Sequence, residues 1–262
     1  MMQSLAVVRT GLEAEQAKMD VISNNLANVN TTGFKRMRPV FSDLLYQDPT
    51  QAGGFTSQAT NYPSGLQQGT GANVVATEPM VTQGSLEQTG NALDIAINGQ
   101  GYFQILLPSG QIAYTRDGSF QISAQGQVVD AKGYQLQPPI TIPRNAQSIT
   151  IGNDGTVSVQ IQRQPQPSQV GLIQLANFIN PAGLQSMGDN LALQTQASGA
   201  PITGQPSQNG LGTLAQGYLE GSNVSVVDEM IDMIATQRAY ELNTQAAKNV
   251  DQMLGYLTQV AQ

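Results

Sequence analysis

Each end of the chain carries a long row of apolar residues at helical spacing, and a long stretch of different character separates the two rows. Only Glu15 interrupts the N-terminal row, which consists of Leu5, Val8, Leu12, Met19, Ile22, Leu26 and Val29. The C-terminal row consists of Val227, Ile231, Ala235, Ala239, Leu242, Ala246, Val250, Met253, Leu257 and Val260. Steps of three and four residues place such side chains on one face of a helix. Because a helix cannot bury its own apolar face, the two ends are predicted to pack on each other or on copies of each other.

The limits of the two helices carry local signals. The C-terminal helix is predicted to begin near Ser225, because Ser225-Val226-Val227-Asp228 has the form of a capping box. Gly33 lies just beyond the N-terminal helix and is a suitable stop. Gly11 lies inside that helix at a cost of about 1 kcal/mol relative to Ala. It is either a tolerated weak position or a point where another backbone approaches closely.

The middle of the chain has the pattern of an antiparallel β domain. Short apolar runs such as Tyr102–Leu107 and Thr156–Ile161 alternate with turn signals such as Asp117-Gly118 and Asp154-Gly155. The predicted fold class is therefore α+β, with long N- and C-terminal α-helices packed together as a coiled-coil-like domain and a central antiparallel all-β domain. The predicted division is an N-terminal helix in 1–30, an extended connecting segment in 31–70, the β domain in 71–216 and a C-terminal helix in 217–262.

The connecting segment differs from both neighbours. Its apolar piece Val40–Tyr46 is predicted to form a short helical turn. The following stretch, Gln47–Pro63, is rich in Gln, Gly, Thr, Ser and Pro and has little to bury. By composition alone this stretch is interpreted as a flexible linker.

Composition excludes several classes of function. Charged residues make up only 11% of the chain and the net charge is −7, which argues against a nucleic-acid partner. His and Cys are both absent, which removes the common zinc ligands, a Cys nucleophile and the usual base of a Ser-His-Asp triad. No apolar stretch approaches the ~20 residues needed to span a bilayer, and the first residues lack the features of a cleavable signal peptide. We therefore expect no cofactor, no metal, no nucleic acid and no membrane insertion.

Three weaker patterns could indicate chemistry, but each has a simpler explanation. Asn98-Gly99-Gln100-Gly101 is better explained as a hairpin turn than as a phosphate loop, because it lacks a third glycine and a following helix. Lys35, Arg36 and Arg38 are interpreted as a solvated basic face or as partners for acids on a neighbouring chain. Carboxylates beside turns are more often recruited for local hydrogen bonds than for acid–base catalysis, and here they are Asp94, Asp117, Asp130 and Asp154.

Longer motifs carry a resemblance to a known family. Residues 24–36, Asn-Asn-Leu-Ala-Asn-Val-Asn-Thr-Thr-Gly-Phe-Lys-Arg, resemble the N-terminal signature of bacterial flagellar rod and hook proteins. Ser222-Asn223-Val224 and the run 237–243 resemble the matching C-terminal signature, and 94–103 with 114–120 resemble the β domain of that family. The resemblance extends over the whole chain in the right order. Chain length and the segment Tyr46 to Pro63 followed by Ser64-Gly65-Leu66 favour the distal-rod branch, with a proximal rod or hook subunit as the alternative.

The resemblance implies a structural role without catalysis. Subunits would leave the cell unfolded through the flagellar export apparatus, without a cleaved signal, and stack helically into a hollow drive shaft across the periplasm. The implied partners are copies of the chain, proximal rod proteins below, hook protein above and the surrounding LP-ring bushing. The expected packing residues of the inner tube are Leu5, Val8, Leu12, Met19, Ile22, Asn24, Asn25, Leu26, Asn28, Val29, Gly33, Phe34, Val227, Ile231, Ala235, Arg238, Tyr240, Leu242, Asn243, Ala246, Val250, Met253 and Leu257. The resemblance reverses the linker interpretation and implies a segment that stiffens the shaft, with Tyr46, Gln47, Gly53, Gly54 and Pro63.

Two alternatives from other classes remain at this point. One is an enzyme acting on peptidoglycan, which needs a pair of carboxylates in a cleft. The other is a secreted adhesin-like module with coiled-coil ends, which would bind a ligand as a small oligomer.

Overall fold

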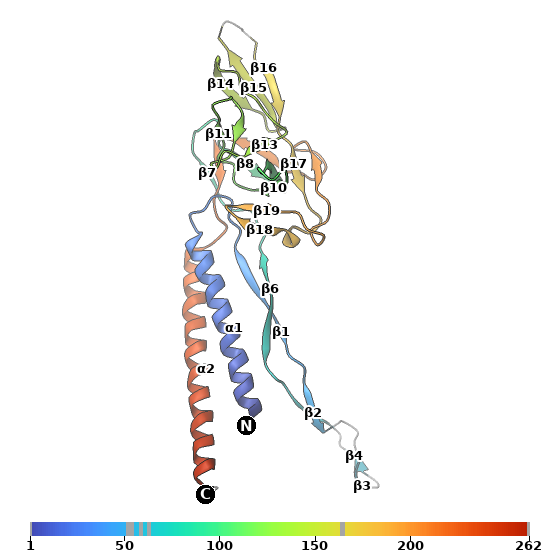
Figure 1. Ribbon diagram of the computed structural model, residues 1–262, viewed down its shortest axis with the longest axis vertical. Coiled ribbons are helices and arrows are strands. Elements are labelled where there is room, and N and C mark those ends of the chain that lie inside the picture. The colour runs from blue at the N-terminus through green and yellow to red at the C-terminus, as the bar shows by residue number, and fades with distance from the viewer. Residues whose placement is uncertain (1, 51–54, 58–59, 62–63, 163–165, 261–262) are drawn as a thin grey trace. The chain divides into compact units, whose positions relative to one another are not determined.

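The structure is a computed structural model, and it divides into two units (Figure 1). The first unit comprises Met1–Ala27, Met37–Glu78 and Ser225–Gln262, and the second comprises Asn28–Arg36 and Pro79–Val224. Residues 71–78 thus group with the helices, and residues 28–36 and 217–224 group with the strands of the second unit. The described residues are 2–50, 55–57, 60–61, 64–162, 166–260.

Two antiparallel helices dominate the first unit. Helix α1 spans Met2–Ala27 and helix α2 spans Val226–Val260, and they pack side by side (Figure 1). The Ser225 hydroxyl accepts a hydrogen bond from the Asp228 N–H at 3.4 Å, and Asp228 and Glu229 lie in the first turn, where the helix dipole favours negative charge. The predicted start of α2 at Ser225 is thereby confirmed.

A two-stranded ribbon completes the first unit. Strand β1 (Met37–Asp43) pairs with β6 (Ala72–Pro79), β2 (Gln47–Thr50) with β5 (Leu66–Gln68), and β3 (Phe55–Ser57) with β4 (Thr60–Asn61). The helical turn expected within Val40–Tyr46 is wrong, since most of this piece lies in β1 and the rest of it forms no helix. The segment is too short to stabilise a helix by itself, and a pairing partner some thirty residues later decides its conformation.

The second unit is built from antiparallel sheets, as predicted. Its largest sheet has the order β11-β12-β13-β9-β10-β19-β18, with β17 pairing both β9 and β20. The strands of this sheet are β9 (Tyr102–Leu106), β10 (Ile112–Thr115), β11 (Gln121–Ile122), β12 (Val128–Val129), β13 (Gln135–Gln137), β17 (Leu175–Asn177), β18 (Gln185–Gly188), β19 (Leu191–Leu193) and β20 (Ile202–Gly204).

Smaller sheets pack with the largest one. They are β14 (Ala146–Ile151), β15 (Thr156–Ile161) and β16 (Ser168–Leu172) in one sheet, β8 (Ile95–Asn98) with β21 (Thr213–Gln216), and β7 (Leu86–Gln88) with β22 (Tyr218–Glu220). A short 3-10 helix, η1, covers Pro181–Gly183. The aliphatic core includes Ile97, Ile105 and Leu136, and Phe103 meets Phe120 edge to face with ring centroids 5.1 Å apart.

The loop Asn98-Gly99-Gln100-Gly101 is not a hairpin turn. It connects β8 to β9, and these strands pair with different partners. A Cβ on Gly99 would lie 2.9 Å from the Gly212 Cα, so the residue type is set by close approach of another backbone.

Candidate assembly surface

One face of α2 presents apolar side chains that the described part of the first unit does not cover. Ile231 is 60% exposed and Leu242 is 67% exposed. We call the following exposed residues the outer row of α2: Val227, Met230, Ile231, Ile234, Leu242 and Met253. Several large apolar side chains exposed on one helix face are typical of an interaction site.

The opposite face of α2 forms the seam with α1. The buried residues of this seam include Ile22 on α1 and Glu229 and Thr236 on α2. Gly11 lies opposite Asn243, since a Cβ on Gly11 would be 3.5 Å from the Asn243 Nδ2. This is an ordinary van der Waals separation, so Gly11 is a tolerated weak position and not an obligatory close approach.

The apolar row inferred for the C-terminal helix therefore does not follow the seam throughout. It begins on the exposed face at Val227 and reaches half-buried positions at Ala246 and Val250. Most successive members of the row are four residues apart, which is more than the 3.6 residues of one helical turn. The row therefore drifts gradually from one face of the helix toward another. A continuous row in the sequence thus belongs to two different faces.

The structure distributes the remaining expected packing residues over all degrees of exposure. Ile22 and Asn25 are buried. Half-buried residues are Val8, Leu12, Met19, Leu26, Asn28, Val29, Gly33, Phe34, Asn243, Ala246 and Val250. Exposed residues are Leu5, Asn24, Val227, Ile231, Ala235, Arg238, Tyr240, Leu242 and Met253, and the Leu257 side chain lies outside the description.

The expected stiffening segment is described only in part. Tyr46 and Gln47 are exposed, whereas Gly53, Gly54 and Pro63 lie outside the described residues. Next to them Leu45 is 89% exposed and Leu66 is 56% exposed. These apolar side chains lie on the ribbon without cover from the described residues of their own unit.

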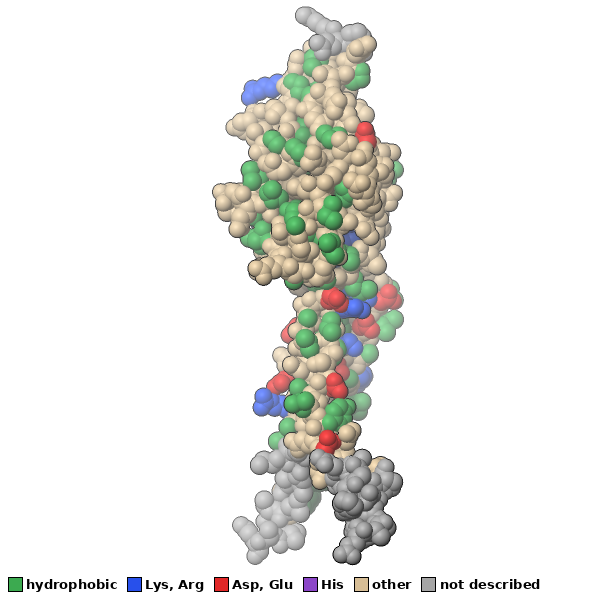
Figure 2. All heavy atoms as spheres, turned by 90° about the vertical axis from the view of Figure 1, so that its right-hand side faces the viewer, with side chains coloured by type: hydrophobic (Ala, Val, Ile, Leu, Met, Phe, Trp, Pro, Cys, Tyr) green, Lys and Arg blue, Asp and Glu red, His purple; other side chains and the backbone are tan. Residues whose placement is uncertain are grey.

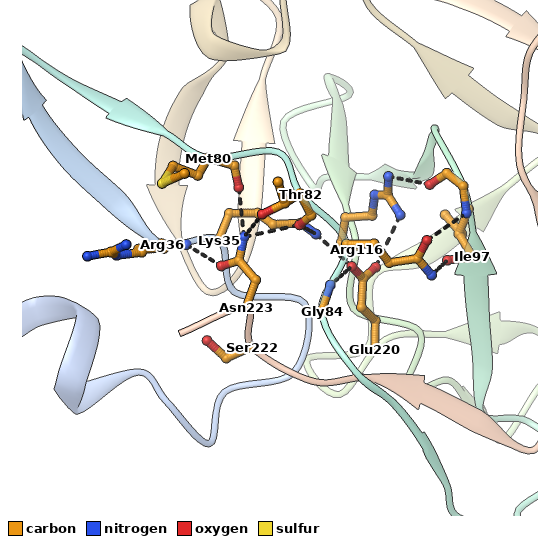
Figure 3. A network of polar contacts seen from close by, with 12 residues as sticks. Lys35, Arg36, Met80, Thr82, Gly84, Ile97, Arg116, Glu220, Ser222 and Asn223 are labelled. Atoms are coloured by element: carbon orange, nitrogen blue, oxygen red, sulfur yellow. Dashed lines mark hydrogen bonds and ion pairs between the residues drawn. The ribbon is translucent and has the colours of Figure 1, made fainter. Parts of the chain in front are cut away.

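A buried ionic network occupies the second unit (Figure 3). The Glu220 carboxylate, fully buried, accepts hydrogen bonds from Lys35 Nζ at 2.6 Å, from Arg116 Nη1 at 3.1 Å and from the Gly84 N–H at 3.0 Å. Arg116 also donates to the Gly99 carbonyl at 2.8 Å, and its guanidinium lies 5.3 Å from the centre of the Tyr102 ring. Burial lowers the pKa of Lys35, and the hydrogen bond and charge of Glu220 oppose that effect.

An amide beside this network connects further segments. Asn223 accepts a hydrogen bond from the Arg36 N–H at 2.6 Å and donates to the Met80 carbonyl at 2.8 Å and to the Thr82 carbonyl at 3.0 Å (Figure 3). Gly33, at φ +69°, packs so closely that a Cβ would lie 2.8 Å from the backbone of Arg116. Parts of the N-terminal, central and C-terminal signature motifs therefore meet within the second unit.

The interpretation of Lys35 as solvated or as a partner for a neighbouring chain is corrected by this network. Its side chain is 10% exposed and its acid lies in the same chain. Arg38 likewise contacts Glu78 of its own chain at 2.8 Å, on the surface. Sequence reasoning missed Arg116 and Glu220 as a pair, because no periodicity or spacing links residues 104 positions apart.

The turn carboxylates make local hydrogen bonds, as expected. Asp117 and Asp154 each accept from the N–H two residues later, at 3.0 and 3.1 Å, and Asp130 accepts from two N–H groups of its own turn. Asp94 accepts from the Asn91 amide at 3.0 Å. Among the described residues, no group of three or more acidic side chains is placed to hold a metal ion.

Comparison with known proteins decides the family. The chain is 54% identical over 260 residues to flagellar basal-body rod protein FlgG of Buchnera aphidicola subsp. Schizaphis graminum, covering 99% of this chain and 100% of that protein. It is 48% identical to flagellar basal-body rod protein FlgG of Caulobacter vibrioides, covering 99% of both. The chain belongs to the FlgG family of flagellar basal-body rod proteins. The FlgG protein of Bacillus subtilis, at 38% identity and 97% coverage of both chains, supports the same assignment.

Three family descriptions match separate parts of this FlgG-family chain. Residues 5–35 match the flagella basal body rod protein family, 96–159 match the FlgE/F/G D1 domain of flagellar hook protein, and 215–260 match the C-terminal domain of flagellar basal body rod FlgEFG protein. The chain is therefore a structural protein of the flagellar basal body and not an enzyme. In the described residues, no helix is both long enough and apolar enough to span a bilayer.

Proposed function

We propose that this FlgG-family chain assembles helically with copies of itself into the hollow drive shaft of the distal rod, which transmits torque from motor to hook and whose lumen is part of the export channel. The outer row of α2 carries this proposal. It presents six large apolar side chains on one helix face, away from the seam with α1.

Burial of this row against neighbouring copies would supply a substantial driving force. A fully buried Val, Ile, Leu or Met side chain contributes about 1.5–3 kcal/mol relative to an exposed one. Each helix pair would use its seam inside the subunit and its outer row between subunits. In this proposal residues 1–30 and 217–262 form a coiled-coil-like inner tube, and 71–216 form the outer β domain.

The surface of the second unit suits contacts that depend little on charge. Figure 2 shows few Lys, Arg, Asp or Glu side chains over its visible face. Neutral hydrogen bonds and apolar contacts are screened little by salt. We infer that contacts of this unit with neighbouring copies and with the surrounding LP-ring bushing are of this neutral kind.

Residues 31–70 are proposed to connect the inner tube to the β domain, with 46–63 stiffening the shaft. Leu45, Tyr46 and Leu66 support this role, because exposed apolar side chains on a two-stranded ribbon gain stability from neighbouring subunits. The proposed partners beyond the polymer are proximal rod proteins below and hook protein above. The proposed route to the periplasm is the flagellar export apparatus, without a cleaved signal.

A single charge in the outer row tests the proposal. Ile231→Asp is expected to leave the fold of the purified chain intact, measured by circular dichroism, and to abolish sedimentable polymer and motility. Gln237→Asp, which adds the same charge at an exposed polar position of α2, is the matched control and is expected to assemble. Polymer and normal motility with Ile231→Asp would refute the assignment of the outer row.

A further inference from the structure

A buried polar contact lies in the seam between α1 and α2, near the C-terminal end of α1 and the N-terminal end of α2. Asn25 is 1% exposed and Glu229 is 0% exposed. The Asn25 Nδ2 donates to the Glu229 Oε2 at 3.2 Å. This contact joins residues from the two ends of the chain within the first unit.

The same amide also holds the first residue of β1. The Asn25 Oδ1 accepts a hydrogen bond from the Met37 N–H at 2.8 Å, and the Asn25 Nδ2 donates to the Met37 carbonyl at 2.8 Å. One side chain on α1 therefore contacts both α2 and β1. An apolar residue of similar size has no groups with which to make these three hydrogen bonds.

The contact discriminates between alternative alignments of the two helices. If α2 slid by one turn, Met233 would replace Glu229 beside Asn25, and the buried amide and carboxylate would lose their mutual hydrogen bond. A buried polar group pays a desolvation penalty for each hydrogen bond that it loses without replacement. Ala246 and Val250, at half-buried positions farther along, impose no such penalty, because apolar contacts adapt to a shifted neighbour.

The alignment of the helices matters for the outer row. One helical turn is about 5.4 Å of translation along the helix axis. A slipped α2 would therefore present its outer row about 5.4 Å away from its proper place along α1 and β1. A helical polymer requires every subunit to present the same surface.

We propose that Asn25 is a positioning residue: its amide sets the register of α2 on α1 and thereby the axial position of the outer row offered to the next copy of the chain. This inference rests on the proposed self-assembly through the outer row. A single polar group at a helix seam is the best-attested device for specifying register, and it acts at some cost in stability.

Engineered disulfides measure the register directly, because the chain has no cysteine. Gly11→Cys combined with Asn243→Cys reports the native alignment, and Gly11→Cys combined with Ala247→Cys reports a slip of one turn. Both pairs are placed in the full-length chain, with and without Asn25→Leu, and oxidised. The yields of the two disulfides are then compared by mass spectrometry of tryptic peptides.

In the chain with Asn25 intact, the native pair is expected to dominate. With Asn25→Leu the ratio of shifted to native disulfide is expected to rise about tenfold, the size expected for the loss of one buried hydrogen bond to a charged group. Asn24→Leu makes the same chemical change at the exposed neighbouring position and is expected to leave the ratio unchanged. Glu229→Gln keeps an acceptor for the Asn25 amide and is also expected to leave it unchanged.

An unchanged ratio with Asn25→Leu would overturn the inference. A parallel fall of both disulfides would overturn it too, because it would show that Asn25 stabilises the pair without setting its register. Sedimentation of the unmodified chain separates this inference from the proposed function. Failure of that chain to form polymer refutes the assembly role, whatever the disulfide ratio shows.

Discussion

The buried carboxylate of Glu220 offers the sharpest test of the energetics. In the described part of the chain, Lys35 and Arg116 both contact this carboxylate, and all three side chains are at most 10% exposed. Glu220→Gln keeps the size of the side chain and removes its charge. Two buried cations would then lie beside an uncharged amide.

The expected loss of stability follows from that burial. Removing one partner of a buried ion pair costs about 3–5 kcal/mol, because an uncompensated charge remains in the interior. For a unit of this size each kcal/mol lowers the midpoint of thermal unfolding by about 2–4 °C, so the expected fall is roughly 6–20 °C. The effect is expected in the second unit, where all three residues lie.

The matched control is an exposed ion pair of the same unit. Lys132 and Asp189 form such a pair, with side chains 49% and 53% exposed. Asp189→Asn is expected to change the free energy of unfolding far less than Glu220→Gln does, because solvent screens the interaction. Urea unfolding of the full chain, followed by circular dichroism in the β region, gives both free energies of unfolding. Equal losses for Glu220→Gln and Asp189→Asn would refute the reasoning.

Three further predictions concern other parts of the chain. Burial lowers the pKa of Lys35 below 10.5, so at pH values between the lowered pKa and 10.5 the unfolded chain binds more protons than the folded chain. The contribution of Lys35 to the free energy of unfolding is therefore expected to rise with pH in this range. Urea unfolding of the wild type and of Lys35→Met at several pH values measures this contribution, and a pH-independent difference between the two would contradict the prediction. Gly11→Ala is expected to stabilise the helix pair by about 1 kcal/mol. Gly33→Ala is expected to destabilise its unit by at least ~1–2 kcal/mol, because Gly33 has φ +69° and the added Cβ would lie 2.8 Å from the backbone of Arg116. Thermal unfolding tests both variants, and a change of the same sign in both would count against the geometry. Deletion of 47–61 is expected to give a softer shaft, and an unchanged bending stiffness in electron micrographs of the polymer would show that the segment is only a linker.

Local signals in the sequence predicted the elements that depend on neighbours along the chain. The N-cap of α2 at Ser225 and the strand Thr156–Ile161 are confirmed at the predicted residues. Capping, turn formation and alternation act over a few residues, so a single sequence contains the relevant information. The chain signatures also pointed correctly to the flagellar rod family.

Elements that depend on distant partners were predicted less well. Residues Met37–Asp43 form a strand because β6 pairs with them, and composition alone favoured a helical turn. Lys35 is buried because Glu220, 185 positions away, provides its counter-charge. Neither partner is visible in the spacing of the residues themselves.

The sequence by itself determined that the two ends are amphipathic helices and that the middle is antiparallel β structure. It also determined that the chain has no His and no Cys, and so lacks the common zinc ligands and any thiol. These properties follow from residue type and short-range periodicity, which persist whatever the chain packs against. Only the tertiary structure decided which face of α2 lies in the seam with α1 and which face remains for other copies. Apolar residues lie on both faces of α2, and the choice between them rests on Asn25, Glu229 and the other seam residues, whose contacts exist only after the two ends of the chain have met.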